Sequence, residues 1–389
     1  MGVGFLKAVI VTNQVRRYLV GFSTMIEPLK DLGFEVIWAA NFKNLVDDPN
    51  KIPCRTYQVD FHSNPLHPGN FIAYQQLASL LRNERIDLLH CNTPIGGLLG
   101  RLCARQARIH PVIYTAHGFH FFSGAPLLNQ IVYKSAERFL ARYTDVLVTI
   151  NEEDFNAARK FRLRKRGRVY KVHGVGVHTN VGVQPGGQEH YRHRLYVREK
   201  LAIHRSAIVV VSVGELNRNK NNEVIIRALG KLERNDIYYV LCGEGKLKDD
   251  LYRLAKRLGL GERVRFLGYR TDIEDILLMA DIFVLPSFRE GLSRALMEAM
   301  ACGLPCVVSA IRGNKDLIDD GEGGILVPPS DVDAFCAAIR LLADDESIRH
   351  EMGAHNRREV LRYSVENVKY EMKAIYETVI CTGNNSEKG

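Results

Sequence analysis

The sequence predicts an α/β protein with two Rossmann-like domains, each a doubly wound parallel sheet. A chain of 389 residues, 46% hydrophobic and 25% charged, is longer than one hydrophobic core usually supports. Short runs rich in Val, Ile and Leu alternate with helix-like segments along its whole length. Continuous apolar runs, rather than alternating ones, are typical of parallel strands that helices cover on both faces.

Eleven strands carry this prediction. Those of the first half are 5–12, 34–40, 86–92, 112–118 and 145–151. Those of the second half are 208–216, 238–245, 264–270, 282–287, 305–310 and 324–329. Helical patterns lie between several of them, for example at 96–107 and 127–143. Because ligands bind beyond the carboxyl ends of such strands, two sheets facing each other would place a cleft between the domains.

The domain boundary is expected within 174–190, GVGVHTNVGVQPGGQEH, which is rich in Gly and polar residues and has no sustained period. The first domain would then span residues 1–180 and the second 190–364. A last helix, 365–380, follows the second domain and is expected to pack back onto the first.

Composition excludes several protein classes. No apolar run approaches the roughly 18 to 20 residues that cross a bilayer, and the N-terminus lacks the pattern of a signal peptide. The eight cysteines form no C-x-x-C motif, and most lie in apolar segments. Examples are Cys91, Cys242, Cys306 and Cys336. This usage favours buried, reduced thiols in a cytoplasmic protein over disulfides or zinc ligands.

The net charge of +9 lies in the first half of the chain. Residues 1–185 carry 23 Lys and Arg against 13 Asp and Glu (+10), whereas residues 186–389 carry 30 against 31 (−1). The excess peaks in 159–171, where eight of thirteen residues are basic. This run is either a solvated loop edge or a contact with anionic lipid headgroups or a phosphorylated acceptor. Nucleic acid is disfavoured, since no aromatic interleaving accompanies the charge.

The segment SFREGLSRALMEAMACGLPCVVS, 287–309, carries two glutamates eight positions apart, Glu290 and Glu298. Ser293 can cap the helix RALMEAMA, which Gly303 then ends. The free N–H groups at the helix start favour an anion, and a diphosphate is the natural guest. Flanking carboxylates can accept hydrogen bonds from vicinal hydroxyls, which sugars and ribose present. An ordinary acidic residue on a surface helix would be the simpler interpretation of either glutamate alone. Two glutamates in so apolar a segment favour the ligand-binding interpretation instead.

This segment resembles the E-x7-E motif of the retaining glycosyltransferases with the GT-B fold, family 4. The similarity covers nearly the whole chain. Matching segments are HCNTPIGGLLGRLCAR (90–105), YTAHGFHFF (114–122), VRFLGYRTDIEDILLMADIFVLPS (264–287) and GGILVPPSD (323–331). The chain is most similar to bacterial members that build capsule or exopolysaccharide repeat units. In such enzymes the first domain binds the acceptor and the second binds the nucleotide sugar.

The resemblance implies roles for residues of the second half. Glu290 would bind the hydroxyls of the donor sugar, Glu298 the ribose, and Phe266 would line the base pocket through backbone groups. The backbone groups on the distal phosphate would be those of Gly291, Leu292 and Ser293. Lys220 falls where the family places a lysine on the diphosphate.

One position departs from the family pattern. The arginine that usually accompanies the lysine is replaced by Glu215, and a carboxylate cannot bind a phosphate as an arginine does. Either Arg218 in the same loop substitutes for it, or Lys220 and the helix start suffice.

His117 follows a strand of the first domain and matches an active-site histidine of the family, although a lone histidine is more often structural. His120 is a weaker candidate, with packing as its simpler interpretation. The glycines of GGLLG (96–100) indicate close helix packing, and CGEG (242–245) indicates a turn near the nucleotide. His117 and Glu290 are therefore the catalytic candidates, with His117 orienting and polarising rather than acting as a strong base.

The resemblance further implies transfer of a hexose or N-acetylhexosamine from a nucleotide sugar, by family habit a UDP-sugar, with retention of configuration. No metal or other cofactor is expected, because the motifs contain no convincing carboxylate cluster. The acceptor would be a glycan or a polyprenyl-diphosphate-linked glycan, with the enzyme peripheral at the inner face of the cell membrane. Two rivals are a sugar-nucleotide epimerase and a non-catalytic sugar-nucleotide binding subunit. The basic first half and the E-x7-E frame oppose the first rival. The missing arginine at position 215 favours the second, which His117, Lys220 and the two glutamates oppose.

Overall fold

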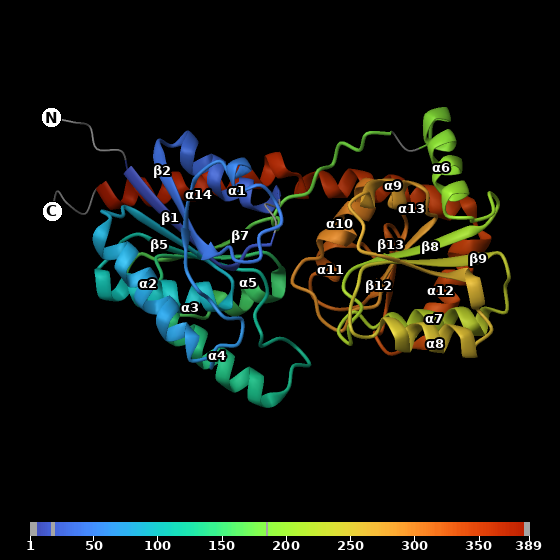
Figure 1. Cartoon of the computed structure of the whole chain (residues 1–389), viewed down its shortest axis with the longest axis horizontal. Coiled ribbons are helices and arrows are strands. Elements are labelled where there is room, and N and C mark those ends of the chain that lie inside the picture. Colours follow the sequence, from blue (N-terminus) through green and yellow to red (C-terminus); the bar gives the residue numbers. More distant parts are fainter. Residues whose placement is uncertain (1–5, 17–19, 184–185, 385–389) are drawn as a thin grey trace. The chain divides into compact units, whose positions relative to one another are not determined.

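The computed structural model describes residues 6–16, 20–183 and 186–384 (Figure 1). The chain divides into two compact units. The first comprises the described parts of residues 1–176 and 365–389, and the second comprises residues 177–364. Each unit is a parallel sheet with helices on both faces (Figure 1), which confirms the predicted doubly wound α/β fold class.

The first unit contains a seven-stranded parallel sheet in the order β3-β2-β1-β4-β5-β6-β7. Its strands are β1 (Leu6–Gln14), β2 (Phe34–Asn41), β3 (Arg55–Gln58), β4 (Leu88–Asn92), β5 (Val112–Ala116), β6 (Val146–Thr149) and β7 (Arg168–Lys171). The order reverses between β1 and β4, and ligands of doubly wound sheets bind at the carboxyl side of this switch point.

Helices α1 and α14 cover one face of this sheet, and α2, α3 and α4 cover the other (Figure 1). The helices of the unit are α1 (Val20–Asp31), α2 (Gly69–Asn83), α3 (Pro94–Ala107), α4 (Leu127–Ala141), α5 (Glu152–Ala158) and α14 (Val365–Asn384), with a 3-10 turn η1 (Pro49–Lys51). The hydroxyl of Tyr376 in α14 lies 2.7 Å from Nδ1 of His90 in β4. Helix α14 is thus anchored to the central strands of the first unit.

The second unit repeats the scheme with six parallel strands in the order β10-β9-β8-β11-β12-β13. Its strands are β8 (Ile208–Val213), β9 (Ile237–Cys242), β10 (Val264–Gly268), β11 (Ile282–Leu285), β12 (Cys306–Ser309) and β13 (Gly324–Val327). Its helices are α6 (Gln188–Lys200), α7 (Asn222–Leu232), α8 (Lys248–Arg257), α9 (Ile273–Leu278), α10 (Arg294–Ala301), α11 (Asn314–Leu317), α12 (Val332–Asp344) and α13 (Glu346–Glu359), with 3-10 turns η2 (Gly261–Arg263) and η3 (Val360–Tyr363). The switch point lies between β8 and β11.

The apolar strands of the second unit supply two cores at once. Val209 and Val211 of β8 pack into the core that includes α9 and α10, whereas Val210 between them packs into the core with α7 and α12. Successive side chains of a strand point to opposite faces, so a strand covered on both sides must be apolar throughout. This is why the uninterrupted Val, Ile and Leu runs identify the strands of this sheet.

Two strands were not predicted from the sequence, β3 (RTYQ) and β7 (RVYK). Both lie at sheet edges and are mostly exposed, so their side chains need not be apolar. β7 occupies the end of the basic run 159–171, which therefore includes an edge strand as well as loop. Lysine and arginine are common on edge strands, where charge discourages pairing with another chain.

The cysteines agree with the prediction from composition. All eight are free in the structure, and six are buried. Burial raises the pKa of the Cys91 thiol to about 12, as expected for inert, protonated side chains. Among the described residues, no helix combines the length and apolar character that crossing a bilayer requires.

Candidate functional site

Backbone contacts hold together the carboxyl ends of three neighbouring strands in the second unit. The amide of Gly243 after β9 donates to the carbonyl of Gly268 at the end of β10 (2.7 Å). A Cβ atom on Gly243 would lie 1.9 Å from the carbonyl oxygen of Gly214, which follows β8. Only glycine permits this approach, so the CGEG turn serves to fix the loop after β8.

The start of α10 has the geometry predicted from the sequence. Ser293 caps the helix, its Oγ accepting from the amide of Leu296 at 3.4 Å, and Gly303 ends it with a φ of 74°. Within the described residues, the amides of Leu292 and Ser293 have no hydrogen-bond partner. These donors stand where the helix dipole favours an anion.

The loop before α10 is also in close backbone contact with the loop after β12. A Cβ atom on Gly313 would lie 2.3 Å from the carbonyl oxygen of Gly291. The position of Gly291 therefore depends on the absence of a side chain at Gly313, which the sequence analysis did not single out.

Lys220 and Glu290 meet at the switch point of the second sheet. Lys220 lies in the loop after β8 and Glu290 in the loop after β11, two strands that are neighbours in the sheet. The Nζ of Lys220 donates to Oε1 of Glu290 at 2.7 Å, and the two side chains are only 21% and 14% exposed. Two residues 70 positions apart thus form one ion pair beside the α10 start.

Arg312 is a basic residue of this region that the sequence analysis missed. It is buried, and its Nε donates to the backbone carbonyl of Glu290 at 3.3 Å. The available signal was a basic residue soon after a buried strand, β12. Arg218 and Glu215 are exposed, and among the described residues the Arg218 side chain has no hydrogen-bond or ion-pair partner.

Two buried hydroxyls lie at the same edge of the sheet without partners in the described part of the chain. They belong to Ser287, after β11, and Ser309, the last residue of β12, and both residues are fully buried. An unsatisfied buried polar group costs about 1–3 kcal/mol, so such groups require an explanation and are frequent at functional sites.

Glu298 lies within α10 and faces a small cavity. Its Oε1 accepts from Nε of Arg294, one turn earlier, at 2.8 Å. Both residues line a cavity of about 200 Å³ together with His178, Thr271 and Glu274. The wall is partly apolar, with Val177, Val181 and Ile273, and a cavity with such mixed walls suits a ring that carries hydroxyls.

Phe266 has a different position from the acidic residues. Its ring packs against Tyr252 of α8, with centroids 6.2 Å apart, and against the core on the α7 side of the sheet. Its side chain is therefore a packing group, and only its backbone is available for the role that the resemblance implies.

In the first unit, His117 directly follows β5. Its Nε2 donates to Oδ1 of Asn92, the last residue of the neighbouring strand β4, at 3.1 Å. Burial lowers the pKa of His117 to about 4, so the ring is neutral at pH 7. With the proton on Nε2, Nδ1 is the unprotonated nitrogen. His120 instead packs edge-on against Tyr133, in agreement with the simpler interpretation.

The glycines of GGLLG also have the predicted role. A Cβ atom on Gly97 would lie 2.3 Å from the ring of Tyr114, and one on Gly100 would lie 2.4 Å from Sγ of Cys91. These glycines allow α3 to pack closely on β4 and β5.

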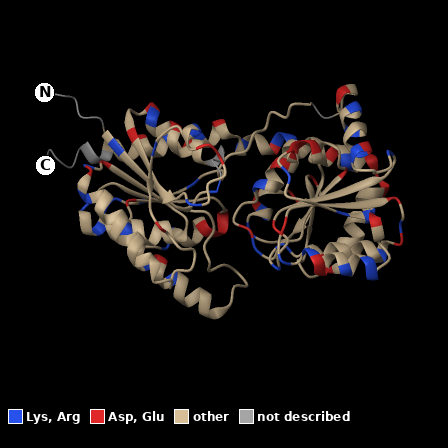
Figure 2. Ribbon diagram, viewed as in Figure 1, with Lys and Arg blue, Asp and Glu red and all other residues tan. Residues whose placement is uncertain are grey.

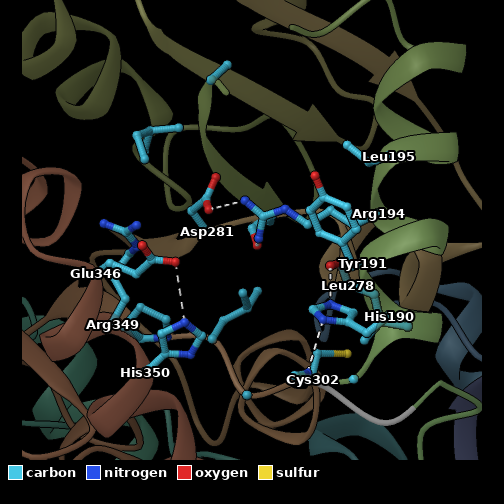
Figure 3. Close-up of a pocket in the computed structure, with 18 of the residues that line it drawn as sticks. His190, Tyr191, Arg194, Leu195, Leu278, Asp281, Cys302, Glu346, Arg349 and His350 are labelled. Atoms are coloured by element: carbon cyan, nitrogen blue, oxygen red, sulfur yellow. Dashed lines mark hydrogen bonds and ion pairs between the residues drawn. The ribbon is translucent and has the colours of Figure 1, made fainter. Parts of the chain in front are cut away.

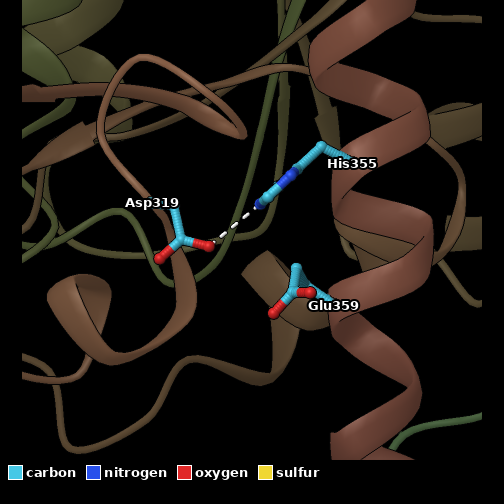
Figure 4. A group of neighbouring side chains, drawn as sticks. All are labelled: Asp319, His355 and Glu359. Atoms are coloured by element: carbon cyan, nitrogen blue, oxygen red, sulfur yellow. Dashed lines mark hydrogen bonds and ion pairs between the residues drawn. The ribbon is translucent and has the colours of Figure 1, made fainter.

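One group of potential metal ligands occurs among the described residues: Asp319, His355 and Glu359 (Figure 4). It lies beside the loop that enters β13, at the amino edge of the sheet rather than at the edge that bears Glu290. The Nε2 of His355 is 2.9 Å from Oδ2 of Asp319, and Glu359 pairs with Arg362. Each acid already has a cationic or hydrogen-bonding partner, so these residues form an ion-pair cluster.

Two family models match the chain. Residues 195–359 match glycosyl transferases group 1, and residues 12–151 match the glycosyl transferase 4-like family. The first match includes Lys220, Glu290 and Glu298, and the second includes His117.

Curated relatives match over most of their length. A putative glycosyltransferase, EpsD, from Bacillus subtilis is 37% identical over 354 residues, which cover 89% of this chain and 90% of the relative. An Escherichia coli UDP-Gal:alpha-D-GlcNAc-diphosphoundecaprenol alpha-1,3-galactosyltransferase is 33% identical over 277 residues, covering 69% of this chain and 70% of the relative.

Solved structures share the fold. Anabaena HepE in complex with UDP and glucose has a TM-score of 0.77 at 18% identity, with 96% of this chain and 100% of that chain covered. Sucrose-phosphate synthase from Thermosynechococcus elongatus has a TM-score of 0.80 at 20% identity, with 97% and 100% covered. The chain therefore belongs to the family 4 glycosyltransferases, enzymes of the GT-B fold that transfer sugars.

Proposed function

We propose that this enzyme transfers a hexose or N-acetylhexosamine from a UDP-sugar to a lipid-linked or saccharide acceptor in surface polysaccharide synthesis, with retention of configuration. The second unit binds the donor, and the first unit binds the acceptor. Glu290 accepts hydrogen bonds from the sugar hydroxyls, and Glu298 from the ribose. Phe266 lines the base pocket through its backbone.

The observation that carries the proposal is the charge arrangement at the β8–β11 switch point. The Lys220 ammonium group lies 2.7 Å from Glu290, beside the unpartnered amides of Leu292 and Ser293. A leaving diphosphate carries negative charge, and fixed donors aimed at that charge stabilise the transition state without reorganisation. The α10 amides therefore favour an anion where the diphosphate would leave, and the Lys220 ammonium group adds its charge once hydroxyls of the donor sugar replace it on Glu290.

Arg312 and Arg218 supply further positive charge near this position. Arg312 contacts the carbonyl of Glu290, and Arg218 extends into solvent from the same loop as Lys220. Arg218 is the group we assign to the role of the arginine that Glu215 replaces. No step of the proposed reaction requires a metal ion.

Relatives support the substrate class. The E. coli relative is named for a UDP-galactose donor and a diphosphoundecaprenol acceptor, and a Campylobacter jejuni relative, 33% identical over 141 residues, for an undecaprenol-diphosphate-linked acceptor. HepE is described in complex with UDP and with UDP-glucose. These names favour a UDP-sugar and a polyprenyl-diphosphate-linked glycan.

Retention follows from attack on the face that the diphosphate leaves. The departing phosphate accepts the proton of the acceptor hydroxyl, so no strong protein base is needed. His117 is neutral at pH 7 and orients the sugar by hydrogen bonding. Glu290 pairs with Lys220 in the structure and accepts from sugar hydroxyls in the proposed complex, and Glu298 pairs with Arg294, so we assign neither carboxylate the role of nucleophile.

A thermal-shift screen against UDP-, GDP-, ADP- and dTDP-sugars tests donor binding. A ligand at about 100 times its dissociation constant adds about 2.7 kcal/mol to the free energy of unfolding. The UDP-sugar that binds should stabilise the wild type and a Lys256→Ala control, but stabilise Lys220→Ala much less. Stabilisation by GDP-, ADP- or dTDP-sugars alone would contradict the UDP assignment.

Incubation of the enzyme with the donor alone separates transfer from epimerisation. Transfer requires an acceptor, so the UDP-sugar should keep its stereochemistry in a chromatographic assay and release UDP when a lipid-linked glycan is added. Conversion of the donor to its epimer without an acceptor would favour the alternative that the protein is a sugar-nucleotide epimerase.

The first unit also offers a surface suited to a membrane. The first half of α4 exposes four apolar side chains, Leu127, Leu128, Ile131 and Val132, each more than half exposed. This half carries no charged residue (Figure 2), whereas the loop that leads into β7 from 159 onward is strongly basic. The two features lie at opposite edges of the sheet, because α4 begins after β5 whereas Arg164 of the basic loop pairs with Asp145 just before β6. Apolar side chains that enter the headgroup region give peripheral binding at the α4 surface, and the basic loop adds long-range attraction to anionic lipids.

Vesicle sedimentation at low salt tests the membrane proposal. The wild type should sediment with vesicles of anionic phospholipid, and the double variant Leu127→Gln, Leu128→Gln should bind several-fold more weakly. The matched control is Leu66→Gln, which changes another exposed leucine of the same unit. Equal binding of all three proteins, or none, would overturn this part of the proposal.

A further inference from the structure

A second cavity lies at the opposite edge of the sheet in the second unit (Figure 3). Its volume is about 510 Å³, and it is bounded by α6, by α13 and by the residues that enter β8, β11 and β12. These entries are at the amino edge of the sheet, whereas Lys220 and Glu290 lie at the carboxyl edge. The size is in the range of small-molecule sites, roughly 300–1,000 Å³.

Four arginines from three segments line this cavity: Arg194 on α6, Arg205 before β8, and Arg349 and Arg357 on α13. Two of them are held in place by the protein. Arg194 pairs with Asp281 (Figure 3), and Nη1 of Arg349 donates to the carbonyl of Leu342 at 2.6 Å. The cavity therefore has a fixed cationic wall.

The acidic residues of the cavity do not neutralise this wall. The Oδ2 atom of Asp281 also accepts from the buried Arg198 at 2.7 Å, so this carboxylate serves two arginines. Glu346 faces His350, with 3.5 Å between the nearest atoms (Figure 3). Within the described residues, the side chains of Arg205 and Arg357 have no hydrogen-bond or ion-pair partner. Two guanidinium groups thus reach the cavity without a counter-charge.

The guanidinium group of Arg357 is positioned by packing. A Cβ atom on Gly303 would lie 2.3 Å from its Nη1 atom, so the glycine that ends α10 makes room for it. A guanidinium fork matches the oxygens of a phosphate, and separate forks on different elements suit a group with several charged oxygens. Tyr191 and Leu195 of α6 add an apolar wall.

We propose that this cavity binds a phosphate-bearing small molecule, with Arg205 and Arg357 as its principal contacts. The site is separate from the proposed diphosphate position, because the two lie at opposite ends of α10: Ser293 begins the helix at one, and Gly303 lines the other. Cys302 lies between this cavity and the one beside Glu298 and lines both.

Calorimetric titration of the full-length enzyme with inorganic pyrophosphate at low salt tests the proposal. One binding step should weaken about tenfold or more in Arg205→Glu and in Arg357→Gln, the loss expected for one charge-assisted contact. The control Arg340→Glu reverses another exposed arginine of this unit and should bind within twofold of the wild type. Lys220→Ala should leave the same step unchanged, which separates this site from the donor loop.

Several outcomes would overturn the proposal. These are an absence of binding by the wild type, equal affinity in the wild type and both cavity variants, or equal weakening in the Arg340→Glu control. Malonate, a dicarboxylate, provides a further arm: binding as tight as that of pyrophosphate would overturn the phosphate class. Arg205 is exposed and its side chain has no partner in the described part of the chain, so its variant should retain the melting temperature of the wild type, and a loss of binding there is not a loss of fold.

Discussion

The two units share the order of their first six strands, to which the first unit adds β7, but they differ at their carboxyl edges. In the second unit, glycines bring the loop after β9 into backbone contact with the loop after β8, and the loop after β12 into contact with the loop after β11. Charged side chains meet at the switch point. In the first unit, the edge bears a neutral pair, His117 and Asn92, and the nearby α4 exposes apolar side chains. One scaffold therefore places a charged pair, Lys220 and Glu290, at the carboxyl edge of the second unit (the charged edge). It places an uncharged pair, His117 and Asn92, near the centre of the corresponding edge of the first unit (the neutral edge), whose outer strand carries the Lys171–Glu152 ion pair.

This difference teaches how the proposed division of labour can arise. A diphosphate has the same shape in every nucleotide sugar, so backbone amides and a fixed ammonium group suit it. Acceptors differ from one enzyme to another, and a binding surface made of side chains can change by substitution to suit each acceptor. The predictions below test whether the charged edge and the neutral edge act independently.

The largest expected effect follows Lys220→Ala at the charged edge. Removing a fixed cation from the leaving group should lower kcat/KM by about 100- to 1,000-fold. The control is Lys256→Ala, an exposed lysine of α8. Steady-state rates of UDP release with donor and acceptor measure both. A loss below fivefold would show that the diphosphate is bound elsewhere.

His117→Ala at the neutral edge should lower kcat by about 100-fold, because an orienting hydrogen-bonding group is removed. UDP affinity should stay within twofold of the wild type, since the donor loop belongs to the second unit. His120→Ala, whose ring packs on Tyr133, is the matched control. Because burial lowers the pKa of His117 to about 4, its titration should not appear in the rate profile between pH 6 and 8. A large loss of UDP affinity would break the proposed independence of the edges.

Comparison of Gly313→Ala with Gly321→Ala separates the effect of backbone strain from the effect of displacing the loop before α10. Both glycines have φ near +80°, but only Gly313 lies against a neighbour, the carbonyl oxygen of Gly291. Gly321→Ala should cost about 1 kcal/mol of stability and leave UDP binding unchanged. Gly313→Ala should cost more and weaken UDP binding about tenfold. Calorimetry with UDP would contradict this argument if the two variants bound equally.

The smallest effect concerns pH and the first unit. Burial lowers the pKa of His90 to about 3, whereas the unfolded chain has a value near 6.5. Between these two pH values the unfolded state binds more protons than the folded state. The free energy of unfolding is therefore unaffected by the protonation of His90 above about pH 6.5 and decreases as the pH falls below that value. At pH 5 the loss from this residue is about 2 kcal/mol relative to pH 7.

Urea unfolding followed by fluorescence measures this loss, because the single tryptophan, Trp38, is buried in the first unit. His90→Gln should reduce the dependence of unfolding free energy on pH between 5 and 7. An unchanged slope in the variant would assign the effect to other groups.

Much of the fold could be predicted from the sequence because buried parallel strands must be apolar on both faces. The edge strands β3 and β7 escaped because exposed edges do not need that signature. Ser293 and Gly303 were identified correctly because caps depend on local backbone geometry, which residue type reveals.

The site was less predictable, because its contacts join residues far apart in the chain. The Lys220–Glu290 pair spans 70 positions, and neither residue type alone shows it. Arg312 and Gly313 were missed because their importance arises from the loop on which they pack, not from their own pattern. The four arginines of the second cavity form no recognisable pattern either, since they come from three separate segments.

The Lys220–Glu290 ion pair has a consequence for how the free enzyme discriminates between the nucleotide sugar and the nucleotide that remains after transfer. If the diphosphate of a free nucleotide attracts the Lys220 ammonium group, Glu290 loses its partner. The Glu290 side chain is only 14% exposed, and an unpaired charge at a buried position costs free energy. A nucleotide bearing its sugar brings hydroxyls that can take over that carboxylate. Lys220 and Glu290 would therefore bind the product nucleotide less tightly than the nucleotide sugar. Donor selectivity and product release would both arise from the replacement of Lys220 by sugar hydroxyls on Glu290.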